Sequence, residues 1–552
     1  MPARHVLAIT FTRRAAQEMR DRLAVLCPGP DRELTVTTFH GLGLRILHEH
    51  HDAAGLGPRF AVADETARLR VAAELTGSER DGRRLLAGLA EDPDGALALR
   101  KELITRDLVD FDGLTEMTAA LLRDNPAVAA GLRDRWPRIS VDEYQDIDPV
   151  QYDLLRAVSG DGAGLTAIGD PDQAIYGFRG ADVSIFGRFT ADFPAAAVVE
   201  LTRNYRSDPA IVTAAVQAIA PATLVPGRRV QGTVAVRDDP AASGSSGPGP
   251  GDPVGAVTVH EAADEHAEAA WIAAMIDQLL GGASFHSLDS GRADGHDHCR
   301  LGLADIAVLY RTDAQAGPLG QALTRAGLPF QKRSHDPLAR RAGVTDIMRE
   351  IRLLNPAVPA PAGGSRDGAG ADVYQQLTAA VHALASARGE KDATVIDIRA
   401  AGELLAPLAR RCGDDLDRFR TEIGLGAETD ALDPRAEAVT LLTLHGAKGL
   451  EFDVVFLAGC ESGLLPLRLP GSGPAGPALR GVDVAEERRL LFVGMTRARG
   501  KLLLSYAARR TRHGAEAPAG RSPFLAAIDP GLLGRIAPRG MRRTGDRQLR
   551  LL

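Results

Sequence analysis

The amino-acid sequence predicts an α/β protein built on parallel sheets. Short apolar runs alternate with helical patterns over residues 1–45 and 137–198, and the same pattern returns over residues 436–530. This alternation is typical of a parallel sheet covered by helices. A second observation is that carboxylates directly follow the apolar runs 138–141 and 165–168.

The elements can be justified in chain order. The run Val6–Ile9 is apolar throughout, which predicts an internal strand of a parallel sheet. Residues 46–136 are rich in helical patterns, for example residues 65–75, where apolar side chains recur at helical spacing after the capping residue Asp64. We therefore expect a helical insertion over residues 46–136.

Later segments differ in composition. Residues 239–256 are rich in Gly, Ser and Pro and are expected to form a surface loop. An amphipathic helix follows over residues 262–280, with Trp271 as the expected core anchor. The next stretch holds residues of metal-binding type, although their irregular spacing argues against a metal site: His286, His296, His298 and Cys299.

Composition predicts a large intracellular protein. The chain has 552 residues, room for several compact units, and a formal net charge of −7. It has no apolar run of membrane-span length and no signal-peptide pattern, so we expect a cytoplasmic protein without a membrane partner. The four cysteines have neither paired nor metal-like spacing, which suits a reducing compartment: Cys27, Cys299, Cys412 and Cys460.

Two segments carry the chemistry of nucleoside-triphosphate hydrolysis. Asp142 and Glu143 follow one apolar run, and residues 169–181 follow the next with Gln173 and an aromatic and Arg-containing stretch. Such chemistry needs a carboxylate for Mg²⁺, a neighbour that orients or deprotonates water, and a polar sensor of the γ-phosphate. Aromatic and arginine side chains suit a stacked single strand of nucleic acid. An isolated Asp-Glu pair would indicate a solvated turn, but the two segments in this order favour the catalytic interpretation.

At these segments the chain resembles the UvrD/Rep/PcrA-type helicases of superfamily 1. Seven blocks follow the family's order and are similar to motifs Ia, Ib, II, III, IV, V and VI, respectively: residues 6–19, 37–41, 142–146, 169–181, 201–207, 443–452 and 486–499. The resemblance implies two RecA-like parallel-sheet motor domains, the first incomplete at its N-terminus, with helical insertions of the 1B and 2B type.

The resemblance also implies a division of the chain. The expected parts are the first motor domain (1A, truncated) at 1–45 and 137–198, insertion 1B at 46–136, the second motor domain (2A) at 199–330 and 436–530, a shortened 2B at 331–435, and a basic tail at 531–552.

One family motif does not occur in these residues. The phosphate-binding pattern G-x-x-x-x-G-K-[ST] is absent, since the nearest match, Gly494 to Lys501, has one residue too many between its glycines and continues with Leu502. We expect that the natural protein extends upstream of Met1. The alternative is a polypeptide that has lost ATP binding.

Roles in ATP hydrolysis follow from the resemblance. Asp142 is expected to bind Mg²⁺, Glu143 to position or deprotonate the attacking water, and Gln173 to sense the γ-phosphate. Arg206 and Arg497 are expected to act as arginine fingers. Glu451 is expected to contact the sugar of the nucleotide.

The resemblance and the stacking argument together give a DNA-binding set. Its members are aromatic, histidine or arginine residues within the motifs: Phe11, Phe39, His40, Tyr176, Phe178, Arg179 and His445. The chain departs from the family pattern at Gly446, where many relatives carry Lys, and at Gly177, where Arg is common, so a phosphate contact is expected to be missing at each.

The predicted function is an ATP-dependent 3′-5′ helicase or translocase on single-stranded DNA, in DNA repair or replication. Its cofactors would be ATP and Mg²⁺, and its partners single-stranded DNA and duplex junctions; the sequence does not identify a loading protein. Two alternatives remain open: a DNA-binding helicase-like subunit without ATPase activity, and the motor part of a larger helicase–nuclease.

Overall fold

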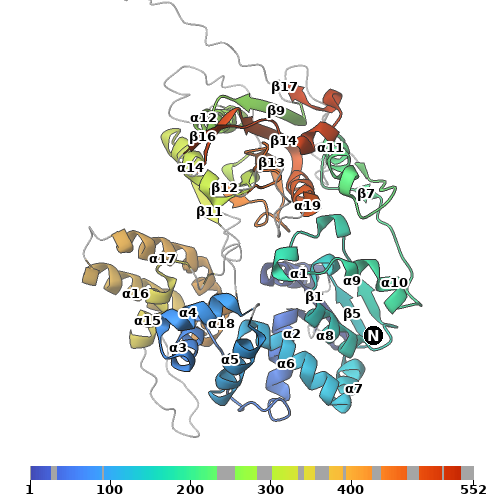
Figure 1. Cartoon of the computed structure of the whole chain (residues 1–552), viewed down its shortest axis with the longest axis vertical. Helices are drawn as coiled ribbons and strands as arrows, with labels where there is room; N and C mark the ends of the chain where they lie inside the picture. The colour runs from blue at the N-terminus through green and yellow to red at the C-terminus, as the bar shows by residue number, and fades with distance from the viewer. Residues whose placement is uncertain are drawn as a thin grey trace, which may run out of the picture. The chain divides into compact units, whose positions relative to one another are not determined.

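The computed structural model describes residues 2–26, 34–89, 92–232, 255–281, 301–333, 338, 341–354, 372–388, 393–425, 437–468, 484–512 and 515–535. The chain divides into two compact units (Figure 1). Unit 1 comprises Met1–Val199 with Arg333–Ala436, and unit 2 comprises Glu200–Lys332 with Glu437–Leu552. The segment predicted as insertion 2B therefore clusters with unit 1.

Unit 1 is built on a four-stranded parallel sheet of order β2-β1-β5-β6. The strands are β1 (Val6–Thr10), β2 (Thr35–Thr38), β5 (Arg138–Val141) and β6 (Leu165–Ala167). Strand β1 has a neighbour on both sides, which confirms that its apolar run is an internal strand. The edge strands are β2 and β6, and Ile168 beyond β6 is 46% exposed.

Helices surround this sheet and extend from it. Asp64 caps α3 by accepting a hydrogen bond from the Ala67 N–H at 2.7 Å, which confirms the predicted cap. Helices α6, α7 and α8 pack against one another, as Figure 1 shows. The helices are α1 (Arg13–Leu26), α2 (Phe39–Glu49), α3 (Glu65–Thr76), α4 (Glu79–Gly88), α5 (Pro93–Thr105), α6 (Phe111–Asp124), α7 (Pro126–Arg135), α8 (Pro149–Ser159), α9 (Ser184–Gly187), α10 (Phe189–Asp192), α15 (Val344–Leu354), α16 (Val373–Arg388), α17 (Ala393–Cys412) and α18 (Leu416–Leu425).

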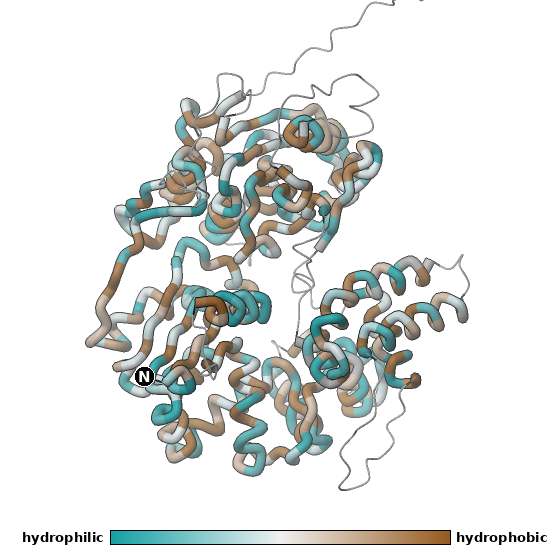
Figure 2. Tube along the Cα trace, turned by 180° about the vertical axis from the view of Figure 1, so that it is seen from behind, coloured by the Kyte–Doolittle hydropathy of each residue, from teal (hydrophilic) through white to brown (hydrophobic). Residues whose placement is uncertain are grey.

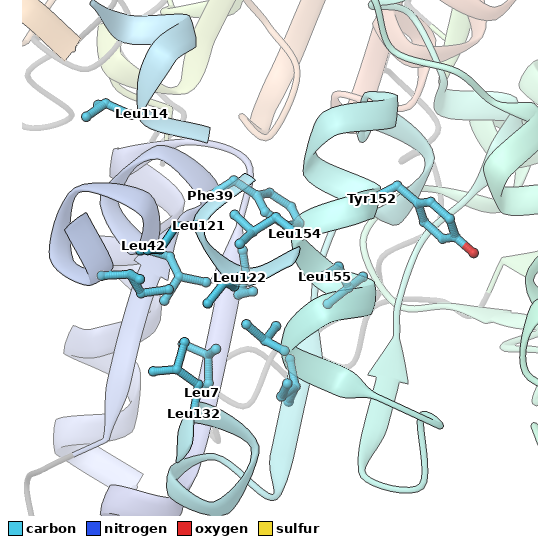
Figure 3. Close-up of a cluster of buried hydrophobic side chains, with 14 of the residues drawn as sticks. Leu7, Phe39, Leu42, Leu114, Leu121, Leu122, Leu132, Tyr152, Leu154 and Leu155 are labelled. Carbon is cyan, nitrogen blue, oxygen red and sulfur yellow. The ribbon is translucent and has the colours of Figure 1, made fainter. Parts of the chain in front are cut away.

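Leucine side chains dominate the core of unit 1. Figure 3 shows Leu42 and Leu121 together with Leu154 and Leu155 of α8 in one cluster. The helices of 344–425 have their own cluster, which includes Phe419. Two ion pairs join this helical group to the remainder of unit 1: Arg13 to Glu422 at 2.7 Å and Arg352 to Asp64 at 2.6 Å.

Unit 2 contains a seven-stranded sheet of order β11-β12-β10-β13-β14-β9-β17. In this sheet β10 pairs in parallel with β12 and β13, β14 with β13 and β9, and β9 with β17. Two parallel sheets with covering helices are typical of two RecA-like domains, so the predicted fold class is confirmed. The elements are β9 (Val257–Ala262), β10 (Ile306–Tyr310), β11 (Phe330–Arg333), β12 (Val439–Thr443), β13 (Phe452–Leu457), β14 (Ala498–Ala507), β17 (Gly534–Arg535), α11 (Pro209–Ile219), α12 (Glu265–Leu279), α14 (Ala316–Arg325) and α19 (Val484–Met495).

Short strand pairs lie outside the two sheets. They are β3 (Ala61–Val62) with β4 (Leu108–Val109), β7 (Arg203–Asn204) with β8 (Gln231–Gly232), and the antiparallel pair β15 (Arg509–Arg512) with β16 (Ala515–Pro518). Trp271 of α12 is partly buried against the core of unit 2 and stacks on His260, with 4.1 Å between ring centroids.

A buried ion network in unit 2 joins α12 to the segments that follow β13 and β14. Arg510 contacts Glu268 and also donates to Glu461 at 2.6 Å, and all three residues are at most 7% exposed. Ser505 Oγ and the Gly459 N–H donate to Glu268 at 2.7 and 2.8 Å, and the Ala507 N–H donates to Glu461 at 2.9 Å. Both carboxylates are thus hydrogen-bonded as well as paired, which buried charges require.

Some predictions fall on residues that the structure does not describe. These are the loop residues 239–254, the residues of metal-binding type at 286–299, Cys27, and tail residues 536–552. Along the described helices, hydrophilic and hydrophobic residues alternate (Figure 2), and none of these helices is long and apolar enough to cross a membrane.

Candidate functional site

The predicted catalytic carboxylates lie at the carboxyl ends of the unit 1 strands. The Asp142 N–H donates to the carbonyl of Ile9 at 2.9 Å, which continues the pairing of β5 with β1 by one residue. On the other side, the Tyr144 N–H donates to the carbonyl of Ile168 at 3.0 Å. The backbone that carries Asp142 and Glu143 is therefore fixed on both sides.

Glu143 adopts a backbone conformation that is rare for a residue with a side chain. Its φ is 54° and its ψ is 41°, in the left-handed region. Such a conformation costs about 1–3 kcal/mol and persists where the surroundings enforce it, often at functional sites. The result is a sharp backbone turn directly after Asp142.

Hydrogen bonds join Glu143 to the segment after β6. Gln145, which is 1% exposed, donates from Nε2 to Glu143 Oε2 and accepts at Oε1 from the Asp170 N–H at 3.0 Å. Asp170 Oδ2 in turn accepts from Gln173 Nε2 at 3.1 Å. The predicted water-positioning glutamate and the predicted γ-phosphate sensor are thus the two ends of one hydrogen-bonded chain, which we call the Gln145 relay.

Gln145 and Asp170 carry no role predicted from the sequence. Both lie inside the recognised blocks, between residues that were assigned. A polar amide between two acidic residues, directly after an apolar strand, is the signal that could have found Gln145, because a buried amide needs partners for both its donor and its acceptor.

The segment that carries Gln173 continues into an aromatic cluster. The rings of Phe11 and Tyr176 are stacked, with 5.0 Å between centroids and 15° between planes. The Arg179 guanidinium lies 5.7 Å from the Tyr176 ring centroid and 5.6 Å from that of Phe178. Tyr176 is only 2% exposed, whereas Phe178 is 64% exposed. Phe178 and Arg179 therefore offer an accessible stacking surface, with Tyr176 and Phe11 beneath.

Like Tyr176, two further residues of the predicted DNA-binding set, Phe39 and His40, pack against protein side chains. Phe39 is 3% exposed in the core of unit 1, where Figure 3 shows its ring among leucine side chains. Phe39 therefore occupies a core position, and its place in the DNA-binding set stays a prediction. The His40 ring is stacked on Phe111 with 3.7 Å between centroids. Burial, together with the nearby Arg13 charge, lowers the pKa of His40 to about 4, so the ring is neutral at pH 7.

In unit 2, Arg206 and Glu451 contact each other. Arg206 donates from Nε and Nη2 to the two carboxylate oxygens of Glu451 at 3.0 and 3.1 Å, and Arg499 Nε lies 3.2 Å from the same carboxylate. Burial alone would raise the pKa of Glu451, but the two guanidinium groups lower it overall. Asn204 Oδ1 supports this arrangement by accepting from the N–H groups of Arg206 and Ser207, both at 2.9 Å.

Arg497 is enclosed within unit 2. It is 2% exposed and donates to the carbonyls of Val493 and Leu450 at 2.9 and 3.3 Å and to Thr496 Oγ1 at 3.0 Å. In the structure the Arg497 guanidinium is thus bound within unit 2, and its role as an arginine finger stays a prediction. His445 lies half-buried in the turn after β12.

The comparisons with known proteins address the family directly. The family described as the UvrD/REP helicase N-terminal domain matches residues 1–89 and 96–194. The family described as the UvrD-like helicase C-terminal domain matches residues 199–357 and 387–509. The chain belongs to the UvrD/REP helicase family. The resemblance inferred from the seven blocks is confirmed.

Individual UvrD/REP relatives match over nearly the whole chain. The chain is 34% identical to the ATP-dependent DNA helicase UvrD2 of Mycobacterium tuberculosis (strain H37Rv), over 96% of this chain and 75% of the relative. It is 30% identical to the ATP-dependent DNA helicase PcrA of Leuconostoc citreum, over 96% of this chain and 79% of the relative. With the PcrA of Bacillus subtilis it shares 27% identity over 96% of this chain and 80% of the relative.

In this UvrD/REP helicase chain, most of the predicted site residues lie in three groups, two in unit 1 and one in unit 2. Unit 1 holds the Gln145 relay and the aromatic cluster, which both use residues 169–181. Unit 2 holds the paired Arg206 and Glu451 and the buried Arg497.

Proposed function

We propose that this chain is the motor of an ATP-dependent DNA helicase that translocates 3′-5′ on single-stranded DNA in repair or replication. The observation that carries the proposal is the Gln145 relay. It links the carboxylate suited to water activation with the amide suited to γ-phosphate sensing, in a chain whose relatives are ATP-dependent DNA helicases.

The donor set of unit 1 fits a magnesium ion. Asp142 offers a hard carboxylate oxygen on fixed backbone at the carboxyl end of β5, and Mg²⁺ in such enzymes takes one or two carboxylates together with substrate phosphates. When bound, the ion would neutralise charge that develops on the phosphates. Asp142 is the residue that would hold it.

Glu143 would accept the proton of the attacking water or orient it. Gln145 holds this carboxylate through its Nε2 amide. Gln173 would contact the γ-phosphate. Because Gln173 is hydrogen-bonded to Asp170 and Asp170 to Gln145, a movement of the Gln173 side chain would change the position of the Glu143 carboxylate. In unit 2, Arg206 and Arg497 would supply positive charge to the transferred phosphoryl group, and Glu451 would bind the nucleotide sugar while keeping Arg206 in place.

Gln145→Glu is expected to lower DNA-stimulated ATP hydrolysis by about 10- to 100-fold, a range typical of residues that orient a reacting group. The substitution keeps the shape of the side chain but removes the donor to Glu143 and adds a second carboxylate beside it. The effect should appear mainly in kcat, because Gln145 orients a catalytic group.

Gln151→Glu is the matched control for Gln145→Glu, since Gln151 is another buried glutamine of unit 1 and is 5% exposed. Equal losses of activity in the two variants, or an unchanged kcat in Gln145→Glu, would show that the relay does not act in hydrolysis.

Phe178 and Arg179 would stack on bases of the translocated strand, supported by Tyr176 and Phe11. His445, half-buried in the turn after β12, stays in the proposed DNA-contacting set. His40 also stays in this set, although one face of its ring is covered by Phe111. Base–aromatic stacking is tolerant of sequence, as translocation requires.

Phe178→Ala is expected to weaken single-stranded DNA binding by about 1–3 kcal/mol, the worth of one stacked base. Fluorescence anisotropy with a labelled oligothymidine measures the loss. Phe178→Trp keeps a stacking surface and should bind like the unchanged protein. If Phe178→Ala binds as tightly as Phe178→Trp, then the ring does not stack on bases.

A second candidate function is a DNA-binding subunit without ATPase activity. It would need only the accessible surface of Phe178 and Arg179 and none of the hydrolytic residues. The two functions are separated by measuring ATP hydrolysis, with and without single-stranded DNA, on the protein purified from its own cells. DNA-stimulated hydrolysis supports the motor, and DNA binding without hydrolysis supports the subunit.

A further inference from the structure

A cavity lined by arginines opens at the other edge of the unit 1 sheet. Its volume is about 780 Å³, and its lining includes Arg4, His5, Arg20, Arg45 and Arg135 together with residues 34–37 of the edge strand β2. Neither the Gln145 relay nor the aromatic cluster contributes to this lining. We call this cavity the arginine pocket.

The arginine side chains that line the pocket come from several helices and strands. Strand β2 lies at the sheet edge, with Arg20 reaching it from α1 and Arg45 from α2. Arg20 donates from Nε and Nη2 to the carbonyl of Val36 at 3.3 and 2.9 Å, so it covers an open backbone acceptor of the edge strand. This contact blocks strand addition at Val36, which makes an extended peptide paired to β2 a poor occupant.

The positive charge of the pocket is only partly neutralised by the acid in contact with its lining. No carboxylate is among the lining residues that the structure describes. Glu49 accepts from Arg45 Nε at 3.0 Å and from Arg135 Nη1 at 2.7 Å, and these contacts outweigh burial to lower the pKa of Glu49. One carboxylate is therefore shared by two of the four lining arginines.

Contacts with Trp136 and with a backbone carbonyl hold the side chains that line the arginine pocket. Arg135 lies 4.7 Å from the ring centroid of Trp136, Arg45 lies 5.8 Å from it, and Trp136 is 1% exposed. His5 Nδ1 lies 3.1 Å from the carbonyl oxygen of Arg135. Because Arg45 and Arg135 are fixed by an aromatic ring and a carboxylate, little side-chain entropy remains to be lost when they bind a ligand.

We propose that the arginine pocket binds phosphate groups, at a site separate from the proposed hydrolytic and strand-stacking residues. Planar guanidinium groups bind phosphate oxygens through paired hydrogen bonds. The hydroxyl of Thr35, which accepts from Arg45 Nη1 at 3.5 Å, can donate its own proton to a further oxygen, and a phosphate offers more oxygens than a carboxylate. The phosphates could be those of a DNA backbone or of a free polyphosphate, and this proposal does not depend on the proposed function.

The test uses Trp136 as a local reporter in the full chain. The protein contains two tryptophans, so Trp271→Phe leaves Trp136 alone, in contact with two pocket arginines. Inorganic tripolyphosphate and an oligothymidine are titrated separately, without magnesium, while Trp136 emission is recorded. We expect a saturable change in emission with tripolyphosphate.

Matched variants connect the response to the pocket. Arg4→Glu with Arg45→Gln should weaken tripolyphosphate binding by about ten- to hundredfold, because two charge-assisted contacts are lost. Arg4→Glu alone, at an exposed position, should weaken it less and guards against a folding defect of the double variant. The control is Arg83→Gln with Arg123→Glu, at side chains that are 68% and 74% exposed, and it should bind as before.

Each outcome decides the proposal. A response to both probes identifies backbone phosphates of DNA, and a response to tripolyphosphate alone identifies a free polyphosphate. Poly-L-glutamate that binds as tightly at equal charge would overturn the proposal in favour of an acidic peptide. No response to any probe, or equal binding by the pocket and control variants, would also overturn it.

Discussion

Glu143→Gln is expected to reduce DNA-stimulated ATP hydrolysis by about 10²- to 10⁴-fold, the usual contribution of a positioned general base. The glutamine keeps the shape of the side chain but cannot accept a proton from water. Binding of single-stranded DNA should be unchanged, because the aromatic cluster is left intact. Steady-state hydrolysis and anisotropy on the same preparation measure both quantities.

Glu18→Gln is the control for this prediction. Glu18 lies on α1 of the same unit, where it pairs with Arg14 at 2.8 Å and belongs to none of the proposed sites. Hydrolysis by Glu18→Gln should match that of the unchanged protein. If Glu143→Gln retained hydrolysis within about twofold, Glu143 could not be the general base.

Arg510→Met is expected to destabilise unit 2 by about 3–5 kcal/mol, because it leaves Glu268 and Glu461 buried without their partner. Urea unfolding followed through Trp271 measures this loss in a variant that carries Trp136→Phe, since Trp271 packs against the core of unit 2. Arg509→Met is the matched control, because Arg509 is 58% exposed in its pair with Glu516 and should contribute at most about 1 kcal/mol.

A compensating variant tests the physical reason for this loss. Adding Glu268→Gln and Glu461→Gln to Arg510→Met removes the unpaired buried charges and should restore part of the lost stability. Arg510→Met with the stability of Arg509→Met would mean that the network is not required for the fold of unit 2.

Much of the fold could be predicted from the sequence because its signals are local. The run Val6–Ile9 is apolar on both faces, as is typical of an internal parallel strand. Asp64 is a capping residue that marks the start of α3. The clustering of 333–436 with unit 1 could not be predicted in this way. It depends on contacts between distant residues, such as Arg13 with Glu422, which leave no periodic pattern in the sequence.

The residue types of the candidate site could be predicted from the sequence, but the solvent exposure of each side chain could not. Phe39 lies in a motif beside polar residues, yet its ring completes the leucine core. Phe178 and Tyr176 lie two residues apart in one loop, and only the structure shows that the first is exposed and the second covered. Gln145 gains its importance from Asp170, 25 residues later, so no local pattern could reveal the relay.

The most direct test of the motor is strand displacement by the protein purified from its own cells, with ATP and Mg²⁺. The substrates are two DNA duplexes of equal length, one with a 3′ and one with a 5′ single-stranded tail. The proposed function predicts displacement of the 3′-tailed duplex, none of the 5′-tailed duplex, and loss of displacement in Glu143→Gln. Binding to both tails without displacement or ATP hydrolysis would contradict it and identify a DNA-binding subunit.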